Sequence, residues 1–119
     1  MDKLGGVDIR LRVVSKREIR SVKTRDGSEH NVVDVVVGDR TGLIRLSLWD
    51  EKIREVEVGD VIDMKNAYVN RFKGLLHLGI GMFGILEKVS DTNFASIEEL
   101  SKVKRRRYTR WSTSLSGQL

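Results

Sequence analysis

The sequence predicts an all-β protein, a small Greek-key barrel of five strands, and three observations support this. Apolar residues alternate with polar ones in several segments, which is typical of strands with one buried face. Tight-turn sequences containing glycine separate these segments, as expected for hairpins. No long helix is predicted, and a β-sandwich would need about seven strands, more than these 119 residues supply. The five-stranded OB-fold barrel, with a short C-terminal helix and a basic tail, is therefore the expected architecture.

The five strands are expected where the alternating or β-branched pattern is found: Val7–Val22, Val32–Val37, Leu43–Trp49, Val61–Phe72 and Leu75–Ile80. The first of these is irregular in its second half. Turns are expected at the glycine-containing segments 25–28, 38–42 and 73–74. The charged connection 50–59 has room for one helical turn at Ile53–Val56. Residues 96–100 predict a short helix capped by Ser96.

The fourth predicted strand changes its buried face partway along. Ile62 and Met64 place even-numbered positions inside, whereas Ala67 and Val69 place odd-numbered positions inside. A β-bulge near Lys65-Asn66 reconciles the two halves, and such bulges are common where small barrels bend.

The outer face of the predicted barrel collects aromatic residues. If Ile44, Leu46 and Leu48 fill the core, Trp49 stands outside together with Arg45. Beyond the bulge, Tyr68 and Phe72 face outward on the neighbouring strand, and His77 does so on the next. Aromatic rings beside cations suit a single-stranded nucleic acid, whose bases stack on rings and whose phosphates bind cations. The alternative is that these rings cap the core or pack beneath the C-terminal segment.

The positive charge lies mainly at the C-terminal end. The net charge is +5, yet Ser101–Trp111 holds six basic residues and no acidic one. The remaining 16 basic residues face all 17 acidic residues, so the predicted barrel is close to neutral. The basic residues expected to bind nucleic acid as a secondary site are Lys104, Arg105, Arg106, Arg107 and Arg110. A tail that only adds solubility, or one that binds a replication or repair protein, is the alternative.

Six short motifs stand in the order and spacing of one protein family. They are Val37-Gly38-Asp39, Thr41-Gly42, Leu46–Trp49, Gly59-Asp60, Asn66-Ala67-Tyr68 and Phe72-Lys73-Gly74. Over residues 7–89 the chain resembles the simple, single-OB-fold single-stranded DNA-binding protein of crenarchaea. This archaeal type is related to eukaryotic single-OB DNA-damage sensors and, more distantly, to the OB domains of replication protein A.

The resemblance implies which residues contact DNA. Trp49, Tyr68 and Phe72 occupy the positions of the three stacking aromatics of that family, and its first-strand contacts fall near Arg20, Val22 and Thr24. Two departures stand out. Family members usually carry a Gly-rich extension, often acidic at its tip, where this chain is basic. The eukaryotic relatives have a further aromatic where Gly79 stands here.

The expected function is binding and protection of single-stranded DNA in replication, recombination or repair, with little sequence preference. Arg45, Lys73 and His77 complete the expected nucleic-acid contacts. An RNA-binding module and a protein-interaction module using the same face remain alternatives. No catalytic pairing of nucleophile and base is found, so no enzyme activity and no cofactor are expected. Residues 79–84 match GxGxxG, but small residues that let strands cross closely explain this segment better than dinucleotide binding does.

Composition and organisation set the remaining expectations. The chain has no cysteine and two histidines, which makes a structural metal site unexpected. No segment is apolar enough for a membrane span or a signal peptide. The expected location is therefore the cytoplasm, in association with the nucleoid. Residues 1–92 are expected to form the nucleic-acid-binding domain, and residues 93–119 the short helix and flexible tail.

Overall fold

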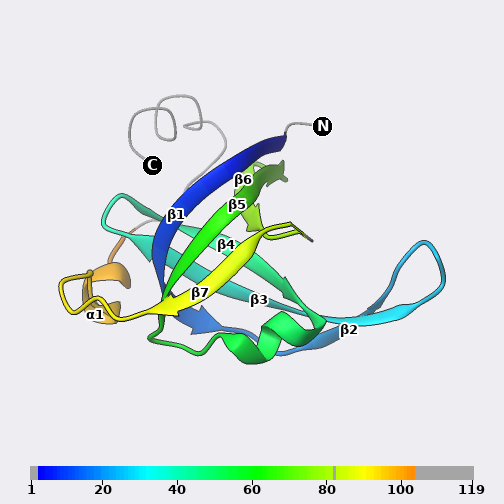
Figure 1. The fold of residues 1–119 in the computed structure, drawn as a ribbon, viewed down its shortest axis with the longest axis horizontal. Coiled ribbons are helices and arrows are strands. Elements are labelled where there is room, and N and C mark those ends of the chain that lie inside the picture. The colour runs from blue at the N-terminus through cyan, green and yellow to red at the C-terminus, as the bar shows by residue number, and fades with distance from the viewer. Residues whose placement is uncertain (1–2, 82, 104–119) are drawn as a thin grey trace.

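The computed structural model describes residues 3–81 and 83–103, which form one twisted sheet with short helical segments (Figure 1). The strands are β1 (Lys3–Lys16), β2 (Arg20–Lys23), β3 (Glu29–Asp39), β4 (Gly42–Trp49), β5 (Val61–Phe72), β6 (Leu75–Gly79) and β7 (Ile85–Val89). A 3-10 helix, η1 (Asp50–Glu55), follows β4, and the helix α1 (Ile97–Leu100) follows β7.

Five of these strands close into a barrel, in agreement with the predicted fold class. The order around the sheet is β1-β3-β4-β6-β5, and pairing between β5 and β1 closes the ring. All pairings in the ring are antiparallel except that of β4 with β6, which is parallel. The two further strands lie outside the ring, where β2 extends β3 and β7 pairs with the first half of β5.

Two predicted segments differ from the structure, and one strand was not predicted. The first predicted strand is broken at residues 17–19, so its second half is the separate strand β2. The strand β7 was not predicted as an element of its own. The helical turn begins at Asp50 rather than at Ile53, because the chain turns immediately after Trp49, and Asp50 takes a φ of 50° to do so.

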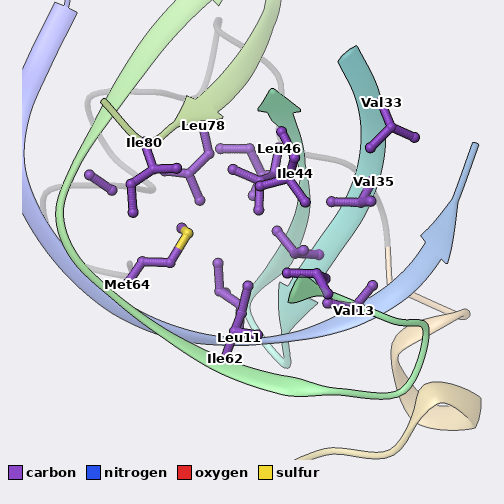
Figure 2. Packing of buried hydrophobic residues seen from close by; sticks show 14 of the residues in the cluster. Leu11, Val13, Val33, Val35, Ile44, Leu46, Ile62, Met64, Leu78 and Ile80 are labelled. Atoms are coloured by element: carbon purple, nitrogen blue, oxygen red, sulfur yellow. The ribbon is translucent and has the colours of Figure 1, made fainter. Parts of the chain in front are cut away.

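The barrel interior is filled by aliphatic side chains from every strand of the ring (Figure 2). Ile44, Leu46 and Leu48 are all buried, as the alternation in β4 predicts. In β6, Leu76 and Leu78 are buried in the same way. The outward positions between them are therefore fixed by the packing of their neighbours, because a slip of one residue would expose the whole core set.

The β-bulge predicted near Lys65-Asn66 is confirmed. Val7 of β1 pairs with Ala67, whereas Ile9 pairs with Met64, so β5 carries one extra residue between these two pairs. Asn66 has a φ of 58°, in the left-handed region that asparagine tolerates better than most residues. The bulge turns Tyr68 to the outside of the barrel while Ala67 and Val69 remain buried.

A second, smaller apolar cluster joins α1 to the barrel. Leu43, Ala95 and Leu100 are buried together there, with Val36 and Val103 packed against them. The helix begins at a capping box in which the Ser96 hydroxyl accepts from the Glu99 amide and the Glu99 carboxylate accepts from the Ser96 amide. This confirms the predicted helix and its cap. The basic tail from Lys104 onward lies outside the described residues.

The GxGxxG segment connects two strands and opens no helix. Residues 80–84 lead from β6 into β7, and the Gly84 amide donates to the Gly81 carbonyl over 3.1 Å. A Cβ at Gly84 would lie 2.4 Å from Cγ1 of Ile80, so the strand crossing leaves no space for a side chain. Close approach of the backbone explains this glycine, and the dinucleotide interpretation is wrong for this segment.

Candidate nucleic-acid interface

The outer surface of β3, β4, β6 and β5 brings several predicted residues into adjacent rows. In one row Ser47 pairs with Asp34 on β3 and with Gly79 on β6, and Gly79 pairs in turn with Tyr68. In the next row Arg45 pairs with His77, and His77 pairs with Asn70. We call these two rows, together with Trp49, the outer face. The register places cations, a carboxylate and aromatic rings on one continuous surface.

Trp49 stands at the end of β4 with 41% of its surface exposed, whereas the adjacent Leu48 is fully buried. Its ring meets His30 edge-on, with the ring centroids 6.0 Å apart and the planes at 68°. An edge contact of this kind leaves a face of the indole free of His30, which is the geometry that base stacking requires.

His30 is held by polar neighbours, and sequence reasoning did not single it out. Its Nδ1 lies 2.8 Å from a carboxylate oxygen of Asp50, and its Nε2 lies 2.9 Å from the Ser28 hydroxyl. The other Asp50 oxygen accepts from the Asn31 amide over 2.9 Å, and this bond, together with His30, lowers the pKa of Asp50. His30 stands two residues before Val32, the partner of Trp49, so a hairpin register would have located it.

Tyr68 is half-buried, and its ring lies over Gly79. A Cβ at Gly79 would be 2.3 Å from Cζ of Tyr68 and 2.5 Å from its hydroxyl oxygen. The absence of a side chain at Gly79 therefore gives the Tyr68 ring its place against the sheet.

Asp34 lies among the predicted cations and was missed. It is 8% exposed, accepts from the Ser47 hydroxyl over 3.0 Å and from Nη1 of Arg20 over 3.1 Å, and has Nη1 of Arg45 at 3.9 Å. Burial opposes its ionisation, but these hydrogen bonds and the two guanidinium groups lower its pKa overall. A lone acid within the apolar run of β3 was the available signal.

The predicted first-strand contacts lie on the β2–β3 hairpin, which projects from the barrel (Figure 1). Arg20 reaches back to Asp34, and half-buried Val22 pairs with His30. Thr24 belongs to the turn, where its hydroxyl donates to Asp26 over 2.6 Å. The structure therefore brings Arg20 and Val22 toward the Trp49 end of the outer face, whereas Thr24 serves the hairpin turn.

The predicted contacts at the other end of β5 lie at its turn into β6. Phe72 is the last residue of β5, and its side chain is outside the described part of the structure. Lys73 follows in the turn with a φ of 51° and is exposed. His77 is half-buried between Arg45 and Asn70. The five predicted tail residues, Lys104 to Arg107 and Arg110, fall outside the described residues.

Within residues 3–81 and 83–103, no three His, Cys, Asp or Glu side chains are grouped so that they could hold a metal ion. In the same residues, no helix has the length and hydrophobicity needed to cross a membrane.

Comparisons with a family model and with a curated relative both identify similarity to single-stranded DNA-binding proteins of the Ssb type. Residues 3–88 match the family described as single-stranded DNA binding protein Ssb-like, OB fold. Single-stranded DNA binding protein Ssb of Saccharolobus solfataricus is 28% identical over 94 residues, which cover 79% of this chain. The chain spans only 63% of the length of that relative.

Solved structures agree on the fold. A hypothetical protein from Arabidopsis thaliana matches with a TM-score of 0.63 at 23% identity, over 86% of this chain and 78% of its own. The second OB-fold domain of replication protein A from Methanococcus maripaludis matches with a TM-score of 0.60 at 23% identity, over 73% of this chain and 86% of its own. At these identities the likeness establishes the architecture alone.

Proposed function

Because the chain belongs to the Ssb-like family of single-stranded DNA-binding proteins with an OB fold, we propose that it binds single-stranded DNA across the outer face. The observation that carries this proposal is the exposure of Trp49 at the end of a strand whose other large apolar side chains are buried. In this proposal Trp49, Tyr68 and Phe72 stack bases. The phosphates or base edges are bound by Arg45, Lys73, Arg20 and His77. The path of the DNA strand is flanked by Val22 and Thr24.

Stacking supplies most of the affinity of the barrel. The 16 basic residues outside Ser101–Trp111 are balanced by 17 acidic ones, so long-range attraction of a polyanion to the barrel is weak. Each base stacked on an aromatic ring is worth about 1–3 kcal/mol, and every base has a face that can stack. Because stacking accepts any base, the proposed binding has little sequence preference.

The biological role that follows is protection of exposed single strands in replication, recombination or repair. Such a role places the protein in the cytoplasm with the nucleoid. Replication or repair proteins are the partners proposed for the basic tail. No chemical step and no cofactor belong to this role.

Trp49 fluorescence tests the proposal most directly. Stacking of a base on the indole should quench its emission when oligo-dT is added. The titration uses a Trp111→Phe variant, because Trp49 is then the single tryptophan of the chain. Emission that stays unchanged at saturating DNA would rule out stacking on Trp49. Parallel gel shifts with single-stranded RNA and duplex DNA separate a DNA-binding protein from an RNA-binding module.

Alanine substitutions separate binding from core packing. Trp49→Ala, Tyr68→Ala and Phe72→Ala should each weaken single-strand binding by about 1–3 kcal/mol. Their melting temperatures should change little if the three rings stack bases rather than pack in the core. Val58→Ala, which removes an exposed apolar side chain outside the outer face, serves as the matched control. A large loss of stability with unchanged binding would instead assign the three rings to packing.

A further inference from the structure

Phe83 has the most exposed large hydrophobic side chain in the described part of the chain, with 82% of its surface accessible. Burying such a side chain would stabilise the fold, and this position forgoes nearly all of that stabilisation. The residue lies in the connection between β6 and β7 and belongs to neither apolar cluster. Stability of the fold therefore does not explain a phenylalanine here.

The connection that carries Phe83 runs beside Tyr68. The ring of Tyr68 lies over Gly79, the last residue of β6, and the Cβ position of Gly81 is 3.8 Å from Cε2 of the same ring. The Asn66 side-chain amide donates to the Phe83 carbonyl over 3.5 Å, which ties the connection to the bulge of β5. Phe83 thus follows the Tyr68 contact by two residues, on a backbone anchored to the strand that presents Tyr68.

A cation stands next to this connection. Lys65, the residue before Asn66, is exposed on β5 and pairs in register with Ile85 of β7. Ile85 in turn follows Phe83 by two residues. An exposed ring and an exposed cation on adjoining stretches of backbone offer a nucleotide a stacking surface for its base and a charge for its phosphate.

We propose that Phe83 is a further base-stacking platform and that Lys65 is its phosphate contact, so that the strand path continues one nucleotide beyond Tyr68. This inference rests on the proposed function and deepens it. The occupant is the same single strand, because the new platform adjoins the Tyr68 end of the outer face.

Binding of oligo-dT of increasing length tests this extension. For the full-length protein, affinity should rise with oligonucleotide length until every platform is occupied. In Phe83→Ala the rise should stop about one nucleotide earlier, and affinity for long oligo-dT should fall about 5- to 150-fold, the range that stacking of one base predicts. Phe83→Trp should restore the affinity. Lys65→Gln should lower the magnitude of the salt slope by about 0.7, the value for one phosphate on a single strand.

Val58→Ala is the matched control. Val58 is also an exposed apolar residue, with 49% of its surface accessible. Its neighbour Gly59 lies against α1, with its Cβ position 3.8 Å from Cδ1 of Ile97, so Val58 is next to α1 and not to the connection that carries Phe83. Removal of this apolar side chain should leave DNA binding unchanged. Thermal melting of every variant should match that of the unmodified protein.

The outcomes separate this inference from the proposed function. If the unmodified protein does not bind oligo-dT, the proposed function fails, and the inference fails with it. If the unmodified protein binds and Phe83→Ala binds equally well at every length, only the inference is overturned, and a protein partner becomes the better explanation of Phe83. A loss of affinity that accompanies a fall in melting temperature, and that Phe83→Trp does not restore, also overturns it.

Discussion

Asp34 determines how much positive charge the outer face presents. Its carboxylate is within 3.1 Å of one guanidinium group, that of Arg20, and within 3.9 Å of another, that of Arg45. Both arginines are therefore partly neutralised before any phosphate arrives, and their orientation is set by an internal partner. In the proposed binding mode this arrangement lowers attraction for polyanions in general and leaves discrimination to the rings, because duplex DNA also offers phosphates but no free base faces.

Substitution of Asp34 by Asn should make the face more cationic. We expect Asp34→Asn to bind single strands more tightly at low salt and to steepen log K against log salt by up to about 0.7. Its preference for single strands over duplex should decrease, since the added attraction does not depend on stacking. Ser47→Ala, which removes a neutral partner of Asp34, is the control that leaves the charge unchanged. An unchanged salt slope would contradict this account of Asp34.

The same carboxylate should make stability depend on acid pH. The folded-state pKa of Asp34 is lowered, so its contribution to the free energy of unfolding is present above the unfolded-state pKa, near 3.9. This contribution is lost as pH falls through the folded-state pKa. At pH 7, Asp34→Asn should be less stable by about 1 kcal/mol, the worth of a typical hydrogen bond. Urea unfolding between pH 7 and pH 2 should show the difference between the two proteins shrinking below about pH 4; a constant difference would contradict the assignment.

At the scale of elements, the bulge of β5 and the end of β6 together build the Tyr68 site. The bulge turns Tyr68 outward, and Gly79 leaves the space that its ring occupies. Both features are needed to place the ring. Without the bulge, the Tyr68 ring would point inward and need a cavity in the core. Without Gly79, the outward ring would collide with a side chain on β6.

Gly79→Ala should displace the Tyr68 ring. The new methyl group would lie 2.3 Å from Cζ of Tyr68, much closer than carbon atoms approach, and the ring must move. Single-strand binding should weaken by about as much as in Tyr68→Ala, about 1–3 kcal/mol. Gly81→Ala is the matched control, since its methyl group would make an ordinary contact 3.8 Å from the same ring. Equal binding by the two glycine variants would show that the ring position does not matter for DNA.

The elements also show what can be read from sequence. Alternation in β4 and the change of buried face in β5 predicted the core and the bulge, because both follow from the pleat and from burial of apolar residues. The break at residues 17–19 and the strand β7 were missed, since pairing with β3 and β5 defines them and little local pattern marks them. Asp34 and His30 were missed for a similar reason. Their partners Arg20 and Asp50 are 14 and 20 residues away in the chain and become neighbours only through strand register.

At the scale of the whole molecule, the rings of the outer face and the excess of positive charge belong to different parts of the sequence. The outer face carries exposed Trp49 and half-buried Tyr68 on a nearly neutral barrel, whereas the excess of positive charge lies in Ser101–Trp111. If the rings and the basic residues both bind DNA, they do so through different interactions. The rings select unpaired bases, and the basic residues attract any phosphate backbone in a way that salt weakens.

Truncation after Val103 separates the two contributions. This end point keeps Val103, which packs against Leu43, Ala95 and Leu100, and removes the five predicted tail cations. If those cations touch phosphates, each should contribute about −0.7 to the slope of log K against log salt on single strands. The truncated protein should then show a flatter slope and weaker binding to single strands and duplex alike.

The preference for single strands should survive the truncation, because the stacking rings remain. Binding isotherms from low to moderate salt, measured for both chains on oligo-dT and on a duplex of equal length, supply the comparison. A full-length protein with the five cations replaced by glutamine controls for loss of the segment itself. If the slopes and affinities of all three proteins agree, the tail does not contact DNA, and its cations are better explained by an acidic surface on a protein partner. If the truncation removes the preference for single strands, the rings of the barrel are not the source of discrimination, and the proposed binding mode is wrong.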